Sequence, residues 1–511
     1  MPARCSLSTV IVIAYQNREI TLAIALALLA ISAGALRVLH HNKYPVGTAL
    51  GVLGALLSIP YLWMFRQKCR PPQLLPGTSQ LIQDAAKIDS IRRGPRPPIW
   101  AAHPFLQFIP WQIQNILHAR FQLPMEAHEF KAADVFSKEE PGGEAMVETL
   151  RCVFYPPRGD LPDAAPIVVY LPGLACNAVD LPGQHTLRYA VNRGYRCAVL
   201  ERRGQWRRLE SARFNVFGDA ADLEAGVGVV RARFPDAPLF LVGVSAGSAL
   251  AVSGVGKFDA RRRAGDDTAP KFLAVGDLFP GFDIAPGGCM ARSRVPFNVV
   301  MLESMRGFFV ERNSELLRAF NAQAYEDAMR ARDCDEFLTA AAPFAGYPSG
   351  REAYDAGENP VRFVEDIETP VLIILAADDP ISTLENFTET KRGSLHEGFS
   401  SSRRWDPALR VPHSDFLPRT PHSLVCVASS GSHCPTLDGY LLPVRPSLAS
   451  LAVWHDEALF DFFDHVRTSS PPSTSSTPLR GRSWRPATSS GEPSPGPCST
   501  RSSACPTSRP P

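Results

Sequence analysis

The stretch that decides the fold is Leu239-Phe240-Leu241-Val242-Gly243-Val244-Ser245-Ala246-Gly247. It reads as a short apolar strand that runs straight into the pattern Gly-x-Ser-x-Gly. In that pattern the serine sits on a sharp strand-to-helix turn, and its hydroxyl projects above a sheet. The glycines are needed because side chains there would clash with the neighbouring strand and helix. A turn at Pro235–Pro238 and the small residues of Ser248–Val255 predict a strand before Ser245 and a helix after it.

Two further residues, each following a predicted strand, complete a site around this serine. A serine hydroxyl becomes an effective nucleophile when a histidine takes its proton and a carboxylate orients that histidine. The run Pro370–Ala376 is followed by Asp378 and Asp379, and Asp379 is the preferred acid because it stands further out on the loop, with Asp378 as the alternative. The run Ser423–Ala428 is followed by His433 on a glycine-containing loop. Serine, acid and histidine in this order predict an α/β-hydrolase triad of Ser245, Asp379 and His433.

Several histidines after Asp379 compete for the role of general base: His396, His413, His422, His433, His455 and His465. The last two lie on a predicted amphipathic helix, and the first two lie on a polar stretch with no strand to hold them in place. His422 precedes its strand and so belongs to the opposite end of a parallel sheet. His433 follows its strand at the edge where Ser245 is expected, which makes it the predicted base.

The oxyanion that forms during acyl transfer needs two backbone N–H donors. One is expected from Ala246, directly after the nucleophile. The other is expected from the loop after the apolar run Ile167–Leu171, where Gly173 lets the backbone approach and Leu174 or Ala175 donates.

Charged residues near this site have two interpretations each. Arg202, Arg203, Arg207 and Arg208 form a basic loop, which is either a solvated turn or a site for a phosphate-bearing lipid headgroup. Asp219 and Asp222 open a predicted helix, and a capping role is favoured over chemistry for both.

The central chain alternates strand and helix. Ile167–Leu171, Arg196–Leu200 and Phe272–Phe279 read as strands, and Gln184–Arg193, Asp219–Phe234 and Leu451–Val466 read as helices. This alternation predicts a mostly parallel central sheet covered by helices on both faces. Val299–Ala342 is mostly helical and fills the place of a cap.

Two apolar runs near the N-terminus predict a transmembrane hairpin. Ile20–Leu36 carries no charge, and Pro45–Phe65 is closed by Arg66, Lys68 and Arg70. Each has roughly the 20 helical residues that cross a bilayer core. A signal peptide is the alternative for the first run, because Ala33-Gly34-Ala35 resembles a cleavage site. The basic cluster after the second run favours a cytosolic catalytic domain, with the endoplasmic reticulum as one candidate membrane.

The expected organisation is a membrane region at 1–70 with candidate helices at 20–36 and 45–65, followed by a linker at 71–100 with a candidate short helix at Ser79–Ile91. A hydrolase domain follows at 101–466, with a cap at about 290–345 and an irregular insertion at 386–419. Residues 467–511 are a Ser/Pro/Arg-rich tail expected to be disordered. The insertion and the tail are either genuine segments or errors in the gene model.

Composition excludes several classes of function. The 511-residue chain has a net charge of only +2, and its basic residues gather at the two ends, so the middle is acidic and a poor binder of nucleic acid. The 11 cysteines form no CxxC pair, and Cys152, Cys176, Cys197 and Cys426 lie in or near apolar runs, as reduced buried thiols do. No Cys/His cluster has zinc-ligand spacing, so neither metal nor cofactor is expected.

From about His103 to Val466 the sequence resembles AB hydrolase superfamily family 4, a branch of membrane-associated esterases and lipases. The resemblance is carried by the motifs His103–Gln107, Leu171–Leu174, Arg203-Gly204, Gly218–Leu223, Arg231–Pro238, Gly243–Gly247 and Pro370–Pro380. It implies hydrolysis or transfer of acyl groups on lipid-like esters, with the triad at Ser245, Asp379 and His433 and an N-terminal membrane anchor. The chain departs from the family with Pro172-Gly173 in place of His-Gly and with Ala246-Gly247-Ser248 in place of Leu-Gly-Gly.

The leading hypothesis is therefore a membrane-anchored serine esterase or lipase acting on a lipid or another acyl ester. An acyltransferase using the same triad is a close variant, because an alcohol can replace water in the second step. A catalytically inactive, membrane-bound interaction protein is the rival from another class, favoured by the altered oxyanion loop and the insertion. The acyl chain, the headgroup and the oligomeric state are not readable from the sequence.

Overall fold

The computed structural model describes residues 61–63, 65–101, 103–108, 123–135, 137–139, 145–156, 160–179, 181–387, 420–439, 444–445 and 450–469. The apolar run Ile20–Leu36, nearly all of Pro45–Phe65, most of the insertion and the tail from residue 470 lie outside these residues. Within the described part of the chain, no helix is both long enough and apolar enough to cross a membrane.

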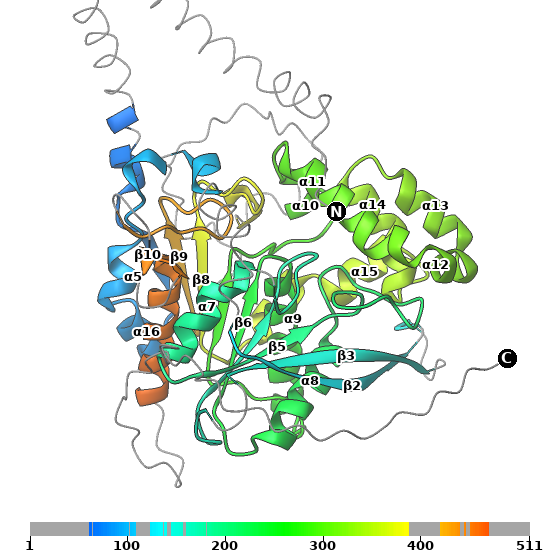
Figure 1. The fold of residues 1–511 in the computed structure, drawn as a ribbon, viewed down its shortest axis with the longest axis horizontal. Helices are drawn as coiled ribbons and strands as arrows, with labels where there is room; N and C mark the ends of the chain where they lie inside the picture. The colour runs from blue at the N-terminus through cyan, green and yellow to red at the C-terminus, as the bar shows by residue number, and fades with distance from the viewer. Residues whose placement is uncertain are drawn as a thin grey trace, which may run out of the picture.

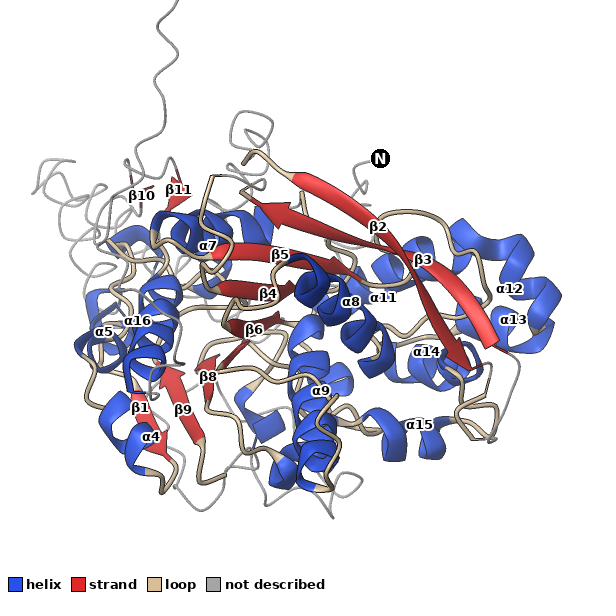
Figure 2. Ribbon diagram, turned by 90° about the horizontal axis from the view of Figure 1, so that it is seen from below, coloured by secondary structure: helices blue, strands red, loops and turns tan. Residues whose placement is uncertain are grey.

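A sheet of nine described strands forms the centre of the molecule, in the order β1-β9-β8-β7-β6-β4-β5-β3-β2 (Figures 1 and 2). The strands from β4 to β9 pair in parallel, whereas β2, β3 and β1 pair antiparallel at the two edges. Their bounds are β1 Gln73–Pro76, β2 Glu126–Val135, β3 Ala145–Tyr155, β4 Ile167–Leu171, β5 Arg196–Glu201, β6 Leu239–Val244, β7 Val275–Leu278, β8 Val371–Ala376 and β9 Ser423–Ala428. A separate two-stranded sheet pairs β10 Val444–Arg445 with β11 Ser450–Leu451.

The order of the parallel strands places two loops side by side at one edge. β4 lies between β5 and β6, so the connection from β4 to β5 runs to one side of β4 and the connection from β5 to β6 crosses back to the other side. Ligands of open α/β sheets bind in the crevice at the carboxyl ends of the strands, where the strand order reverses. Leu171 at the end of β4 pairs with Gly243 near the end of β6. The loops after β4 and β6 therefore start next to each other.

Helices cover the sheet, and the long connection from β7 to β8 along the chain forms an additional helical layer (Figure 1). The helices are α4 Gln80–Ala85, α5 Asp89–Arg93, α7 Leu181–Asn192, α8 Ala220–Arg233, α9 Ala246–Arg263, α10 Cys289–Arg292, α11 Phe297–Met305, α12 Ser314–Phe320, α13 Ala322–Arg330, α14 Cys334–Ala341, α15 Arg351–Glu358 and α16 Trp454–Ser469. Shorter turns are η1 Ile99–Ala101, η3 Arg306–Val310, η4 Glu311–Asn313, η5 Ala342–Ala345, η6 Pro360–Asp366 and η7 Leu384–Phe387.

Two hydrophobic cores lie on opposite faces of the sheet because successive strand side chains point to opposite sides. Phe240 and Val242 of β6 pack in one core with Phe460 and Phe463 of α16. Leu239 and Leu241 pack in the other core, which holds residues of α8 and α9. A mostly parallel sheet covered on both faces was predicted from the strand–helix alternation, and it is confirmed.

The helices between β7 and β8 build a third core. Phe309, Phe337 and Phe344 are buried there, together with Ala246 and Ala249 of α9. The sequence predicts helical structure over Val299–Ala342, and α11 to α14 occupy that range. This helical layer thus packs against the start of the helix that follows Ser245.

The N-terminal part of the sheet differs from what the sequence suggested. Residues 71–100, expected to be a linker, supply β1, α4, α5 and η1, and β1 pairs with β9. Strands β2 and β3 were not anticipated at all. β2 is an edge strand whose side chains include exposed His128 and Glu129, so it lacks the apolar run by which buried strands are recognised.

Asp277 of β7 is a carboxyl group in the centre of the sheet. Its side chain is fully buried, and neither carboxyl oxygen has a hydrogen-bond partner among the described residues. Burial raises the pKa of Asp277 well above its ordinary value near 3.8, because desolvation disfavours the charged form. The folded protein therefore keeps this group protonated under conditions in which the unfolded chain would release the proton.

We expect Asp277→Asn to raise the free energy of unfolding at neutral pH. The folded-state pKa is raised, so the wild type loses stability as pH rises above the unfolded value near 4, by about 1.4 kcal/mol for each pH unit until the folded pKa is reached. Asparagine has a similar shape and no charge to lose. Urea unfolding of both proteins between pH 4 and 8 should show the difference growing with pH, and a difference independent of pH would contradict the argument.

Candidate active site

Ser245 occupies a strained turn between β6 and α9. Its backbone φ of 55° and ψ of −118° lie in a region that non-glycine residues rarely adopt. Its N–H donates to the carbonyl oxygen of Leu278 at 2.9 Å, which ties the turn to the end of β7. The strand ends at Val244 and the helix begins at Ala246, as the sequence pattern predicts.

The glycines on both sides of this turn are required by the backbone that surrounds them. A Cβ atom at Gly247 would lie 2.6 Å from the carbonyl oxygen of Pro172, in the loop after β4. A Cβ atom at Gly243 would lie 2.6 Å from the Cα of Ser248, in helix α9. Backbone atoms cannot rotate away from such contacts, so the predicted clashes with strand and helix are the reason for both glycines.

The structure brings the three predicted triad residues together. His433 Nε2 lies 2.8 Å from Ser245 Oγ, and His433 Nδ1 lies 2.8 Å from Asp379 Oδ2. Of the other described candidates, His422 directly precedes β9, at the opposite end of that strand from the His433 loop, and two have partners outside the triad. His455 Nδ1 lies 2.7 Å from Thr436 Oγ1, and His465 Nε2 lies 3.3 Å from the carbonyl oxygen of Leu81. His396 and His413 lie outside the described residues.

The two adjacent aspartates have different partners. Asp379 points to His433, and its second oxygen, Oδ1, accepts N–H groups of Ile381 at 2.7 Å and Ser382 at 2.9 Å. Asp378 points away to a buried ion pair, with Oδ2 2.6 Å from Lys68 Nζ. The acid next to the histidine is therefore the residue that the sequence favoured over its neighbour.

The surroundings of His433 stabilise its protonated form. Burial by itself would lower the pKa of His433, but the charge of Asp379, together with the hydrogen bond between them, outweighs it and holds the pKa well above the ordinary value near 6.5. The ring of Phe279 stands edge-on to the imidazole, with ring centres 6.1 Å apart. The buried imidazole of His433 is therefore a base whose protonated form the carboxylate of Asp379 stabilises.

The loop after β4 runs against the turn of Ser245. A Cβ atom at Gly173 would lie 3.5 Å from the Cβ of Ser245, an ordinary contact distance. Arg202 Nη2 donates to the carbonyl oxygens of Pro172 at 2.9 Å and Gly173 at 2.8 Å. Because a trans peptide unit is planar, its C=O and N–H point in opposite directions. The N–H of Leu174 is consequently directed away from Arg202.

This orientation bears on the two predicted oxyanion donors. The N–H of Ala246 is the first of helix α9, where the amide groups have no partner within the helix. The N–H of Leu174 belongs to the peptide unit that Arg202 orients from the other side. Proline at position 172 removes only its own N–H, so the departure from His-Gly leaves the donor of Leu174 in place.

Both interpretations of the basic loop are wrong for its first two members. Arg202 is buried, and desolvation lowers its pKa to about 10 while its guanidinium binds backbone carbonyls. Arg203 is also buried and forms a two-point ion pair with Asp222, with both distances 2.8 Å. Neither is free for a phosphate. Sequence reasoning missed these contacts because a run of arginines normally indicates a solvent-exposed loop.

The predicted capping role of Asp219 is confirmed. Its carboxylate caps α8 by accepting the N–H of Ala221 at 3.0 Å.

One described group could hold a metal ion, at some distance along the chain from the triad residues. His185, His455 and Asp456 are all buried, with ligand atoms within 4.8 Å of one another. Hydrogen bonds already use several of these atoms. Asp456 accepts from Thr186 at 2.7 Å and lies 3.1 Å from His185 Nδ1. The cluster therefore links α7 to α16 as a buried polar network.

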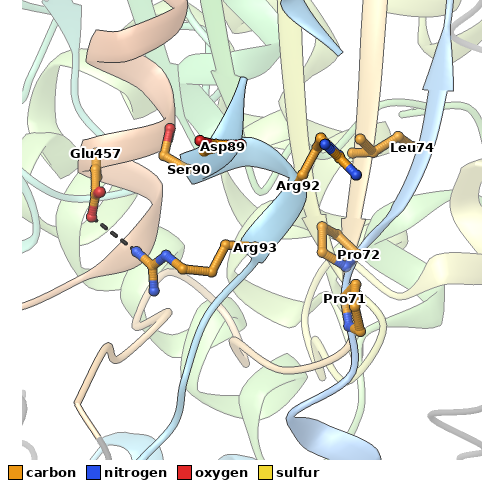
Figure 3. A pocket seen from close by; sticks show the side chains of 8 residues that line it. All are labelled: Pro71, Pro72, Leu74, Asp89, Ser90, Arg92, Arg93 and Glu457. Carbon is orange, nitrogen blue, oxygen red and sulfur yellow. Dashed lines mark hydrogen bonds and ion pairs between the residues drawn. The ribbon is translucent and has the colours of Figure 1, made fainter. Parts of the chain in front are cut away.

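A surface cavity of about 620 Å³ lies elsewhere, between β1, α5 and α16 (Figure 3). Its lining residues are Pro71, Pro72, Leu74, Asp89, Ser90, Arg92, Arg93 and Glu457, none of which belongs to the triad. Arg93 points across to Glu457 at 2.9 Å and also binds Asp438. The guanidinium of Arg93 is thus already paired with carboxylates of the protein.

Parts of the chain are similar to known proteins. No protein-family model matches the chain. Over 201 residues it is 32% identical to Protein ABHD15 of Homo sapiens, covering 38% of this chain and 39% of that protein. Over 232 residues it is 25% identical to Monoacylglycerol lipase ABHD2 of Homo sapiens, covering 42% and 52%. A solved fungal esterase from Rhizomucor miehei covers 77% of this chain and 98% of its own, at 14% identity and a TM-score of 0.34. The chain thus matches about half, or less, of the length of these curated relatives.

The raised pKa of His433 predicts the pH dependence of Ser245 reactivity. Only the neutral imidazole can accept the serine proton, so the rate of labelling by a fluorophosphonate should rise with pH along a limb whose midpoint lies above 6.5. Asp379→Asn removes the charge that raises the pKa. The midpoint should then move to lower pH, while the maximal rate falls by on the order of 10⁴-fold. Equal midpoints in the two proteins would refute this coupling.

Proposed function

We propose that the chain is a member of the AB hydrolase superfamily and a serine hydrolase that cleaves carboxylic esters of lipid-like substrates, as its sequence similarity to ABHD15 and ABHD2 supports. The observation that carries this proposal is the pair of hydrogen-bond contacts that joins Ser245 Oγ to the imidazole of His433 and that imidazole to Asp379, both at 2.8 Å. Such a pair of contacts converts a serine hydroxyl into a nucleophile. Its position at the carboxyl ends of parallel strands is where ligands of this architecture bind.

The proposed reaction assigns a role to each residue. His433 Nε2 takes the proton of Ser245 Oγ as the oxygen attacks the ester carbonyl carbon. Asp379 holds the opposite ring nitrogen and stabilises the imidazolium that forms. The N–H groups of Leu174 and Ala246 bind the oxyanion of the tetrahedral intermediate. His433 then returns the proton to the leaving alcohol, and a water molecule, activated by the same imidazole, hydrolyses the acyl-enzyme.

Two observations support a lipid-like ester as the substrate. One sequence relative is named a monoacylglycerol lipase. In addition, large apolar side chains at Phe105, Val299 and Val300 are exposed, and Phe105 stacks on Phe297, with ring centres 5.5 Å apart. The α10–α11 connection that precedes these valines contacts the acid loop, since the N–H of Arg294 donates to the carbonyl oxygen of Pro380 at 2.8 Å.

We further propose that the protein is integral to a membrane through the apolar runs Ile20–Leu36 and Pro45–Phe65. Both are close to the length that spans a bilayer core. The basic residues after the second run favour a cytosolic catalytic domain. Exposed Leu62 and Trp63 continue the second run into the described part of the chain.

Labelling by a fluorophosphonate probe tests the proposed activity directly. We expect Ser245 to be the single labelled residue and Ser245→Ala to be unlabelled yet folded. On a short-chain chromogenic ester, His433→Ala should lose on the order of 10⁴-fold in turnover. His465→Ala is the matched control, with an expected loss under roughly tenfold, because its ring lies beside the backbone carbonyl of Leu81 and not at the triad. Absence of labelling in the wild type would favour the inactive interaction protein instead.

Carbonate extraction tests the membrane proposal. We expect the full-length chain to remain with the membrane pellet, because two spanning helices are released only by detergent. A variant lacking residues 1–60 should pass to the soluble fraction in large part. Release of the full-length protein by carbonate would refute a spanning hairpin.

A further inference from the structure

Lys68 is a charged side chain inside the protein, only three residues after the end of the apolar run Pro45–Phe65. It is 1% exposed, and its Nζ lies 2.6 Å from Oδ2 of the fully buried Asp378. Removing two charges from water costs several kcal/mol per ion in proteins. A buried ion pair of this kind therefore adds little to stability by itself. Its other contacts show which parts of the chain it holds in place.

The second oxygen of Asp378 holds the loop that carries the histidine. Asp378 Oδ1 accepts the N–H of Ser432 at 2.8 Å, and Ser432 directly precedes His433. Ser432 and Cys434 have φ values of 50° and 81°, so both neighbours of His433 are non-glycine residues in the left-handed region. Non-glycine residues keep such a conformation only where surrounding contacts impose it. The Asp378 acceptor is one of those contacts.

The segment around Lys68 is also tied to the start of the same loop. Ser429 Oγ lies 3.0 Å from the carbonyl oxygen of Lys68 and 2.7 Å from that of Arg70. Ser430 Oγ accepts from Gln107 Nε2 at 2.9 Å. The loop is thus held at its start by Lys68, Arg70 and Gln107, and next to His433 by Asp378.

We propose that Lys68 is a positioning residue for His433 and that it acts through Asp378. Its ammonium fixes a carboxylate in the interior, that carboxylate fixes the N–H of Ser432, and the strained loop then presents the imidazole to Ser245. The inference rests on the proposed hydrolase function. It adds that the segment directly after the predicted membrane anchor completes the active site rather than merely tethering it.

Paired variants of the full-length protein separate positioning from stability. Lys68→Met should slow turnover of a short-chain chromogenic ester by roughly ten- to hundredfold, because small misplacements of a catalytic group have effects of this size. KM should change by less than about threefold, since Lys68 does not touch the substrate. Fluorophosphonate labelling of Ser245 should slow in parallel with turnover.

Two neutral double variants then isolate the acceptor. Lys68→Met with Asp378→Asn keeps a side-chain oxygen for the N–H of Ser432, and we expect labelling within about threefold of the wild-type rate. Lys68→Met with Asp378→Leu replaces the pair by apolar groups, which proteins often tolerate without loss of stability, but it removes the acceptor. This variant should fold, and the probe should still label its Ser245 roughly ten- to hundredfold more slowly than in the wild type. The comparison stands even where Lys68→Met alone fails to fold.

Lys138→Met is the control for loss of a buried cation. Lys138 Nζ lies 2.5 Å from Asp219 and also binds Glu358, away from the triad loops. It should lower the unfolding temperature while leaving the labelling rate of folded protein near that of the wild type. The inference is overturned if the folded asparagine and leucine double variants label equally fast, or if Lys138→Met slows labelling as much as Lys68→Met. A wild type that is not labelled at all refutes the proposed hydrolase itself.

Discussion

The close approach of two backbones beneath Ser245 is the constraint on which the site depends. Gly247 in the first turn of α9 packs directly against the carbonyl groups at the end of β4, at a distance that leaves no room for a Cβ atom. This contact lies directly beside Ser245, whose φ of 55° and ψ of −118° carry the chain from β6 into α9. It also brings the loop after β4 within contact of the serine. One steric requirement therefore places both the nucleophile and the backbone that faces it.

Polar groups buried around this turn are arranged to hold backbone rather than to bind a ligand. Arg202 reaches the carbonyl oxygens of Pro172, Gly173 and Phe217, and Gln205 also donates to Gly173 at 3.2 Å. A buried guanidinium without a carboxylate partner in these contacts is expensive, which is reflected in its lowered pKa. Its Nη1 and Nη2 groups donate to these three carbonyl oxygens, while its Nε has no hydrogen-bond partner among the described residues. The hydrogen bond from Arg202 to the carbonyl oxygen of Gly173 fixes the peptide unit that also carries the N–H of Leu174.

Much of this arrangement could be predicted because strong local signals mark it. Apolar strands followed by glycine, acid or histidine are visible in the sequence, and the structure brings Ser245, Asp379 and His433 within hydrogen-bonding distance as the strand order requires. Their catalytic roles stay a prediction. The edge strand β2 and its neighbour β3 escaped recognition because exposed residues interrupt their apolar pattern. The partners of Arg203 and Lys68 escaped it because they depend on residues far along the chain, and no local pattern encodes such pairs.

The N-terminal segment shows how a stretch that looks like a linker can become structural. Without β1, strand β9 would be an edge of the sheet, and its unpaired backbone groups would need covering. Residues Gln73–Pro76 pair with Leu424–Val427 and remove that edge. The chain just before them contributes Lys68 to the interior beside the acid loop. β9 leads into the loop of His433, so the strand and the loop are both braced by residues that follow the apolar run.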